Sequence, residues 1–130
     1  MKKYAFGVDI GGTAVKIGLF EISGNLSDKW EIKTRTEYGG KYILEDIPKA
    51  IGSKLRETGI LHHDVEGIGM GVPGPVGQDG TVFKCVNLGW GIFNVEDRMN
   101  SLIGFKVKVG FLYSITIIMC RKPGHTIGIF

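Results

Sequence analysis

Cysteine is scarce in this chain, and no long apolar run occurs. The two cysteines, Cys85 and Cys120, form no CxxC pair, so we expect no disulfide scaffold and a reduced, cytoplasmic protein. The longest apolar stretch, FLYSITIIMC, has ten residues, whereas a membrane helix needs about 20. The opening MKKYAFGVDIGG is too short and too interrupted to be a signal peptide. We therefore expect no membrane partner.

Clustered positive charge is also missing. The formal net charge is +3 over 130 residues, and the lysines and arginines are dispersed. Proteins that bind nucleic acid usually carry a basic block, so no nucleic-acid partner is expected. With 43% hydrophobic and 22% charged residues, the composition is typical of one soluble globular domain.

Glycine, by contrast, is abundant, and two glycines stand in the segment FGVDIGGTAVKIGLF, between two apolar runs. Gly11 and Gly12 lack Cβ atoms and reach positive φ at little cost, so a turn built from them can aim successive N–H groups at an anion. Thr13 adds a hydroxyl donor. Asp9 lies at the end of the preceding run, and a carboxylate beside a phosphate implies a cation such as Mg²⁺. The segment predicts a phosphate and magnesium site, and the alternative is an ordinary Gly-Gly hairpin.

Periodicity predicts an α/β arrangement with a mixed sheet. A helix is indicated by Leu44, Ile47, Ile51 and Leu55 on one face, with Gly59 as its end and Pro48 in the first turn or at a kink. A second helix is expected between the cap Asn94 and Gly104. HHD at 62–64 is expected to be a solvated loop. The expected strands cover residues 4–10, 15–22, 26–36, 81–86 and 105–109, together with 65–76, which runs into a Pro/Gly loop.

Three segments in order give the chain a resemblance to a known family. VDIGGTAVKIGLF resembles the first phosphate motif of the sugar-kinase, actin and heat-shock ATPase superfamily, and with GIGMGVPGPV and VNLGWGIFNVEDRM it resembles the ROK sugar kinases, in particular ROK glucokinases. The resemblance covers about residues 2–110, which correspond to the N-terminal domain of that family. It implies an RNase H-like (actin-like ATPase) lobe, with a mixed five-stranded sheet and flanking helices, bordering a cleft for ATP and sugar.

The resemblance also implies nucleotide contacts. Gly11, Gly12 and Thr13 would contact the ATP phosphates, and Asp9 would hold Mg²⁺ largely through water. Lys16 would sense phosphate, or it is simply an exposed strand lysine.

The implied sugar contacts come from the two later segments. Gly74 and Pro75 match the loop that borders the sugar in the family. The amide of Asn87 would meet a sugar hydroxyl, and the alternative is an asparagine that only stabilises its own loop. Trp90 is expected to pack and not to stack on sugar.

The resemblance stops after Gly110. The family continues with an Asn-Asp-Ala-Asn segment whose aspartate is the general base, but no Asp or Glu follows Asp97 here. No catalytic residue is therefore assigned, and the zinc-binding segment of the family is absent as well. Residues 111–130 form a non-family tail, for which we hypothesise a reading-frame change near codon 111. Its apolar composition favours an extra strand, a homodimer contact or aggregation.

The expected function is that of the N-terminal lobe of an ATP-dependent glucokinase, acting on the 6-hydroxyl of glucose and inactive as this chain alone. A kinase for N-acetylmannosamine or another hexose is the substrate alternative. A ROK-type transcriptional regulator is disfavoured because the phosphate hairpin begins close to Met1, which leaves no room for a DNA-reading element. A non-catalytic nucleotide-binding domain is the remaining alternative.

Overall fold

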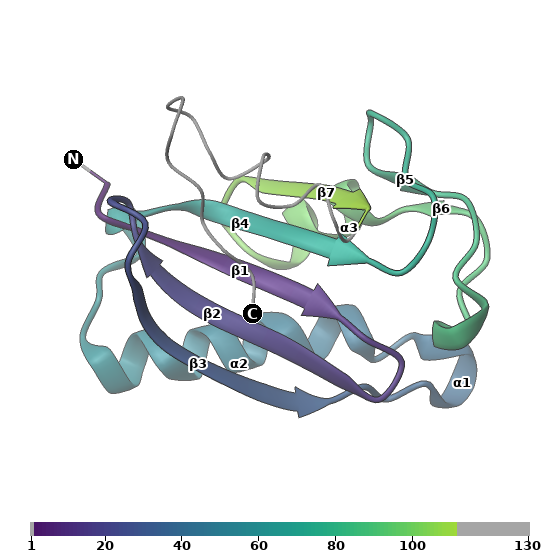
Figure 1. Cartoon of the computed structure of the whole chain (residues 1–130), viewed down its shortest axis with the longest axis horizontal. Helices are drawn as coiled ribbons and strands as arrows, with labels where there is room; N and C mark the ends of the chain where they lie inside the picture. The colour runs from purple at the N-terminus through teal and green to yellow at the C-terminus, as the bar shows by residue number, and fades with distance from the viewer. Residues whose placement is uncertain (1, 112–130) are drawn as a thin grey trace.

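The computed structural model describes residues 2–111, which form a five-stranded mixed sheet with helices on one face (Figure 1). The strand order is β3-β2-β1-β4-β7. The first three strands form an antiparallel meander, and β4 and β7 run parallel to β1. The strands are β1 (Tyr4–Ile10), β2 (Ala14–Glu21), β3 (Leu26–Lys33), β4 (Val65–Val72) and β7 (Val107–Phe111). The predicted mixed sheet is confirmed.

The helix α2 (Ile43–Thr58) covers the sheet as its apolar spacing predicts. Its buried side chains include Ile43, Ile47 and Ile51. Gly59 ends the helix in the left-handed conformation, with φ of 75°, and its N–H donates to the carbonyl of Leu55. Pro48 lies in the second turn and not in the first, so the carbonyl one turn earlier receives no hydrogen bond from it.

The helix α3 (Val95–Leu102) lies against the same face of the sheet as α2 (Figure 1). The predicted cap is confirmed, because the Asn94 side chain accepts a hydrogen bond from the N–H of Asp97 at 2.9 Å. The helix ends at Leu102, however, and Ile103 is already extended. Gly104 is therefore not its last residue.

Three sequence expectations for the segments that connect the strands of the five-stranded sheet differ from the structure. The strand expected over residues 81–86 is short: β5 (Thr81–Val82) pairs with β6 (Phe93–Asn94), and the 3₁₀ helix η2 (Val86–Leu88) follows. The strand expected over 26–36 ends at Lys33 and is followed by α1 (Glu37–Gly40), which the sequence did not predict. The expected loop at 62–64 is a 3₁₀ turn, η1 (His62–Asp64).

The core lies between the sheet and the two helices. Along β1, the fully buried side chains Phe6, Val8 and Ile10 alternate toward the helices. The residues between them face the other way, and there Gly7 pairs with Gly18 of β2 and with Gly69 of β4. The sheet thus has one face of large apolar side chains and one face crossed by a row of glycines.

The predicted tail of residues 111–130 lies outside the described residues from 112 onward. Within residues 2–111, no helix has the length and apolarity to cross a membrane.

Candidate functional site

The turn between β1 and β2 is held by its own backbone. The Gly11 N–H donates to the carbonyl of Ala14 at 3.0 Å. A Cβ atom on Gly11 would lie only 2.8 Å from that same oxygen, so no larger residue fits there without movement. Neither Gly11 nor Gly12 has positive φ. The positive φ that glycine permits is therefore not used at either position, and Gly11 instead serves a close backbone approach.

Two N–H groups of this turn remain available to a ligand. Within residues 2–111, the N–H groups of Gly12 and Thr13 have no hydrogen-bond partner, and both residues are exposed. The predicted series of converging donors is smaller than expected, because the Gly11 N–H closes the turn instead. Two adjacent amides and the Thr13 hydroxyl are what the turn offers an anion.

Asp9 lies one residue before this turn, half-buried at the end of β1. It pairs across the strands with Lys16 on one side and with Gly71 on the other. Burial raises the pKa of the Asp9 carboxyl, and the positive charge of Lys16 opposes that rise. Among the described residues the Asp9 carboxylate makes no hydrogen bond or ion pair, and no group of three or more metal-binding side chains gathers anywhere. Lys16 is exposed.

The loop after β4 carries the residues predicted to border a sugar. Gly74 is buried, and a Cβ atom there would lie 2.7 Å from the Cys85 sulfur, so Gly74 lets two loop segments pack together. Pro75 is exposed, and its carbonyl accepts a hydrogen bond from the N–H of Phe83 at 3.1 Å. Both residues lie at the carboxyl end of β4, the edge at which α/β sheets bind ligands.

Asn87 brings the two halves of the predicted site together. It lies in η2, exposed, and a Cβ atom on Gly12 would be 3.7 Å from the Cβ of Asn87. Its amide makes no hydrogen bond within the described part of the chain, which gives no support to a loop-stabilising role. The amide is therefore free to meet a ligand next to the β1–β2 turn.

The loop that carries Asn87 rests on the backbone of α1. The Trp90 indole N–H donates to the carbonyl of Gly40 at 3.1 Å, and Trp90 is buried as predicted. A Cβ atom on Gly89 would lie 3.2 Å from the Cα of Gly39. The sequence did not identify this support, although the paired glycines before α2 were a signal for a close backbone contact.

Thr34 is another residue that the sequence did not single out. It is the one buried polar side chain among the described residues, with 4% of its surface exposed. Its N–H donates to the carbonyl of Thr13 at 2.9 Å, and its hydroxyl donates to the carbonyl of Gly11 at 2.7 Å. Both of its partners lie more than twenty residues earlier in the chain, so no local pattern marked it.

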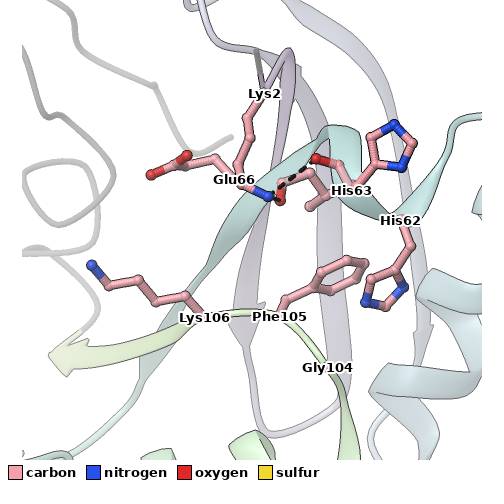
Figure 2. A pocket seen from close by; sticks show the side chains of 8 residues that line it. Lys2, His62, His63, Glu66, Gly104, Phe105 and Lys106 are labelled. Carbon is pink, nitrogen blue, oxygen red and sulfur yellow. Dashed lines mark hydrogen bonds between the residues drawn. The ribbon is translucent and has the colours of Figure 1, made fainter.

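A separate hollow of about 520 Å³ lies at the opposite, amino ends of β4 and β7 (Figure 2). The Lys2 ammonium donates to the carbonyls of His63 and Val65 at its edge. His62 stacks on Phe105 with ring centres 3.9 Å apart. This hollow is remote from the β1–β2 turn and shares no residue with the predicted site.

Comparisons with known proteins identify relatives of this chain. Residues 5–111 match the ROK family. A glucokinase from Halalkalibacterium halodurans is 36% identical over 98 residues, which are 75% of this chain and 30% of that protein. An N-acetylgalactosamine kinase, AgaK, from Shewanella sp. (strain ANA-3) is 32% identical over 89 residues, 63% of this chain and 26% of its own length.

Solved structures share the fold. A ROK family glucokinase from Streptomyces griseus, in complex with glucose and AMPPNP, superposes with a TM-score of 0.70 at 27% identity, over 83% of this chain and 33% of that one. The predicted fold class, an actin-like ATPase lobe, is confirmed by this likeness. The chain spans about a third of the length of the glucokinases it matches. Its motifs, its sheet and these matches together show that the chain belongs to the ROK family.

Proposed function

We propose that this chain is the N-terminal lobe of an ATP-dependent sugar kinase whose acceptor is the 6-hydroxyl of glucose. The observation that carries the proposal is the close approach of Gly12 to Asn87. Phosphoryl transfer depends on holding donor and acceptor side by side, and these residues are candidates for contacting the phosphate and the sugar. The glucokinase relatives support glucose as the acceptor.

The nucleotide would lie with its terminal phosphates on the β1–β2 turn. The N–H groups of Gly12 and Thr13 have no partner among the described residues and are suited to phosphate oxygens. The Asp9 carboxylate, which makes no ion pair there, fits a Mg²⁺ ion bound through water and phosphate, as magnesium usually is beside a single carboxylate. That ion would neutralise phosphate charge. Gly11 shapes the turn, and Lys16 adds positive charge nearby.

The sugar would lie beside the loops after β4. Gly74 and Pro75 would form its border, and the Asn87 amide, which can both donate and accept, would hydrogen-bond a sugar hydroxyl. Residues 1–110 are thus the proposed kinase lobe, and residues 111–130 are the proposed non-family tail. We also propose a cytoplasmic location, and a homodimer is a further expectation.

This chain alone is proposed to bind nucleotide without transferring phosphate. No Asp or Glu follows Asp97, so the general base expected from the ROK resemblance is missing. General-base catalysis contributes on the order of 10²- to 10⁴-fold. The electrostatic clamp on a phosphoryl group also needs both sides of a cleft.

The test combines calorimetry with a coupled kinase assay. Calorimetry measures ATP binding to the chain with and without Mg²⁺, and Asp9→Asn serves as the variant that should lose the magnesium dependence. The assay measures glucose-dependent ADP formation by the chain and by a longer chain in which a ROK second lobe follows residue 110. We expect binding by the short chain and turnover by the longer chain. Absence of nucleotide binding, or turnover by the short chain, would contradict the proposal.

An amino-sugar kinase is the second candidate, favoured by the similarity to an N-acetylgalactosamine kinase. Testing the longer chain with N-acetylmannosamine and N-acetylgalactosamine beside glucose separates these substrates by kcat/KM. A longer chain that binds ATP but phosphorylates no sugar would instead favour a non-catalytic nucleotide-binding domain or a ROK-type regulator.

A further inference from the structure

Thr34 hydrogen-bonds to the backbone of the β1–β2 turn, which is the turn proposed to bind phosphate. It follows β3, and its two hydrogen bonds both go to carbonyls of the turn, its N–H to Thr13 and its hydroxyl to Gly11. The hydroxyl bond, at 2.7 Å, is as short as hydroxyl hydrogen bonds in proteins usually are. The Thr34 side chain therefore contacts the peptide unit that joins Gly11 to Gly12.

That peptide unit contains the Gly11 carbonyl and the Gly12 N–H. The peptide bond is planar and trans, so the C=O and N–H of one unit point in opposite directions. Because Thr34 fixes the direction of the Gly11 carbonyl, it also fixes the direction of the Gly12 N–H. That N–H then points away from Thr34 and is left without a partner among the described residues.

The position of Thr34 is itself secured by its neighbour. The Arg35 guanidinium forms two hydrogen bonds of 2.7 Å to the two carboxylate oxygens of Asp46 in α2. Arg35 also lies over the Tyr42 ring, 4.3 Å from its centre. A bidentate pair of this kind fixes direction as well as distance, so the segment after β3 is tied to the helix layer while Thr34 reaches into the turn.

We propose that Thr34 is a positioning residue for phosphate binding: its hydroxyl orients the Gly12 N–H toward the nucleotide through the shared peptide unit. The proposal rests on the proposed function, because it assigns the phosphates to this turn. Thr34 touches no phosphate itself. A purely structural role would change stability and leave nucleotide affinity unchanged at temperatures where the chain is folded.

The test compares Thr34→Val with Thr34→Ser. Valine keeps the shape and the backbone bond to Thr13 but removes the hydroxyl, whereas serine keeps the hydroxyl. Thr58→Val is the matched control, because it also removes a threonine hydroxyl bonded to a backbone carbonyl, that of Lys54 at 2.8 Å, on α2. Calorimetric titration with Mg²⁺ and ATP should show Kd about tenfold weaker for Thr34→Val, the effect of losing about one hydrogen bond. Thr34→Ser and Thr58→Val should bind like the parent chain.

A second measurement tests, without nucleotide, whether Thr34 orients the Gly12 N–H. The ¹⁵N heteronuclear NOE of the Gly12 amide should fall in Thr34→Val and stay at the parent value in Thr34→Ser, because only valine frees the peptide unit. An unchanged NOE in Thr34→Val, or equal ATP affinity of that variant and the parent, overturns the role of Thr34. If the parent chain binds no ATP, the proposed function fails, and the NOE still shows whether Thr34 orients the turn.

Discussion

A Cβ atom on Gly12 would lie 3.7 Å from the Cβ of Asn87, so the β1–β2 turn and the loop of η2 touch although they are far apart in the sequence. The contact lies where β1 and β4, which are parallel neighbours, both end. A ligand at this edge therefore meets backbone N–H groups of the β1–β2 turn and the side-chain amide of Asn87 in the loop of η2.

The two glycines of the turn should respond differently to alanine. In Gly11→Ala the new methyl would lie 2.8 Å from the Ala14 carbonyl oxygen, so we expect a loss of about 1–3 kcal/mol in the free energy of unfolding. In Gly12→Ala the methyl makes an ordinary contact with Asn87, so stability should be unchanged while ATP binding weakens. Urea denaturation and calorimetry measure the two effects. Equal stability of Gly11→Ala and the parent would show that the turn is not fixed as described.

Removing the indole N–H of Trp90 should loosen the support of the Asn87 loop. Trp90→Phe leaves the buried carbonyl of Gly40 without its donor, which should cost about 1–3 kcal/mol in the free energy of unfolding. Trp30→Phe is the comparison, because the Trp30 indole N–H donates no hydrogen bond among the described residues and its ring lies beneath Lys54. Urea unfolding of both variants should show the larger loss for Trp90→Phe, and an equal or smaller loss would contradict the assignment.

Asp9 should reduce stability at neutral pH. Because burial raises its pKa in the folded state, the folded chain binds the proton more tightly than the unfolded chain does. The charged carboxylate therefore costs stability at pH 7. The cost is relieved as the pH falls through the raised pKa, and it is gone below the ordinary pKa of the unfolded state. Asp9→Asn should accordingly be more stable than the parent at pH 7 and equally stable in strong acid, as urea denaturation at several pH values would show.

Asp79 provides a control because its pKa is shifted in the opposite direction to that of Asp9. Hydrogen bonds from the N–H and hydroxyl of Thr81 lower the pKa of its carboxyl. Its stabilising effect is present above the ordinary pKa and is lost as the pH falls through the lowered pKa. Asp79→Asn should therefore be less stable than the parent at pH 7. If both variants shifted stability in the same direction, the environment assigned to Asp9 would be wrong.

Local patterns were sufficient for the elements whose signals lie within a few residues. The apolar spacing of α2, the left-handed Gly59 and the cap Asn94 all follow from short-range rules, and the structure has each of them. The β1–β2 hairpin was also predicted, together with the position of Asp9 before its turn. The conformation of the turn glycines could not be predicted. The contact that excludes a side chain at Gly11 is made by a backbone carbonyl, which leaves no signal in the residue types.

The elements that were missed depend on partners distant in the sequence. In α1, Tyr38 has a φ of 56°, an unfavourable value for tyrosine, and the neighbouring glycines pack against the loop of Trp90. The apolar and β-branched residues at 81–86 resemble a strand. In the structure, however, Cys85 forms only an isolated antiparallel β-bridge with Trp90, and Val86 is 73% exposed. Thr34 likewise bonds to carbonyls more than twenty residues earlier, which no local window includes.

The row formed by Gly18, Gly7 and Gly69 has a consequence for how the strands find their alignment. Sliding β1 by one position against β2 would place Phe6 or Val8 beside Gly18 and turn their large side chains out of the core, because a shift of one residue exchanges the two faces of a strand. A sheet mispaired by one residue would thus lose hydrophobic burial along the whole of β1. The buried side chains of β1 therefore disfavour a one-residue slip, although the glycine row itself has no side chains that interlock.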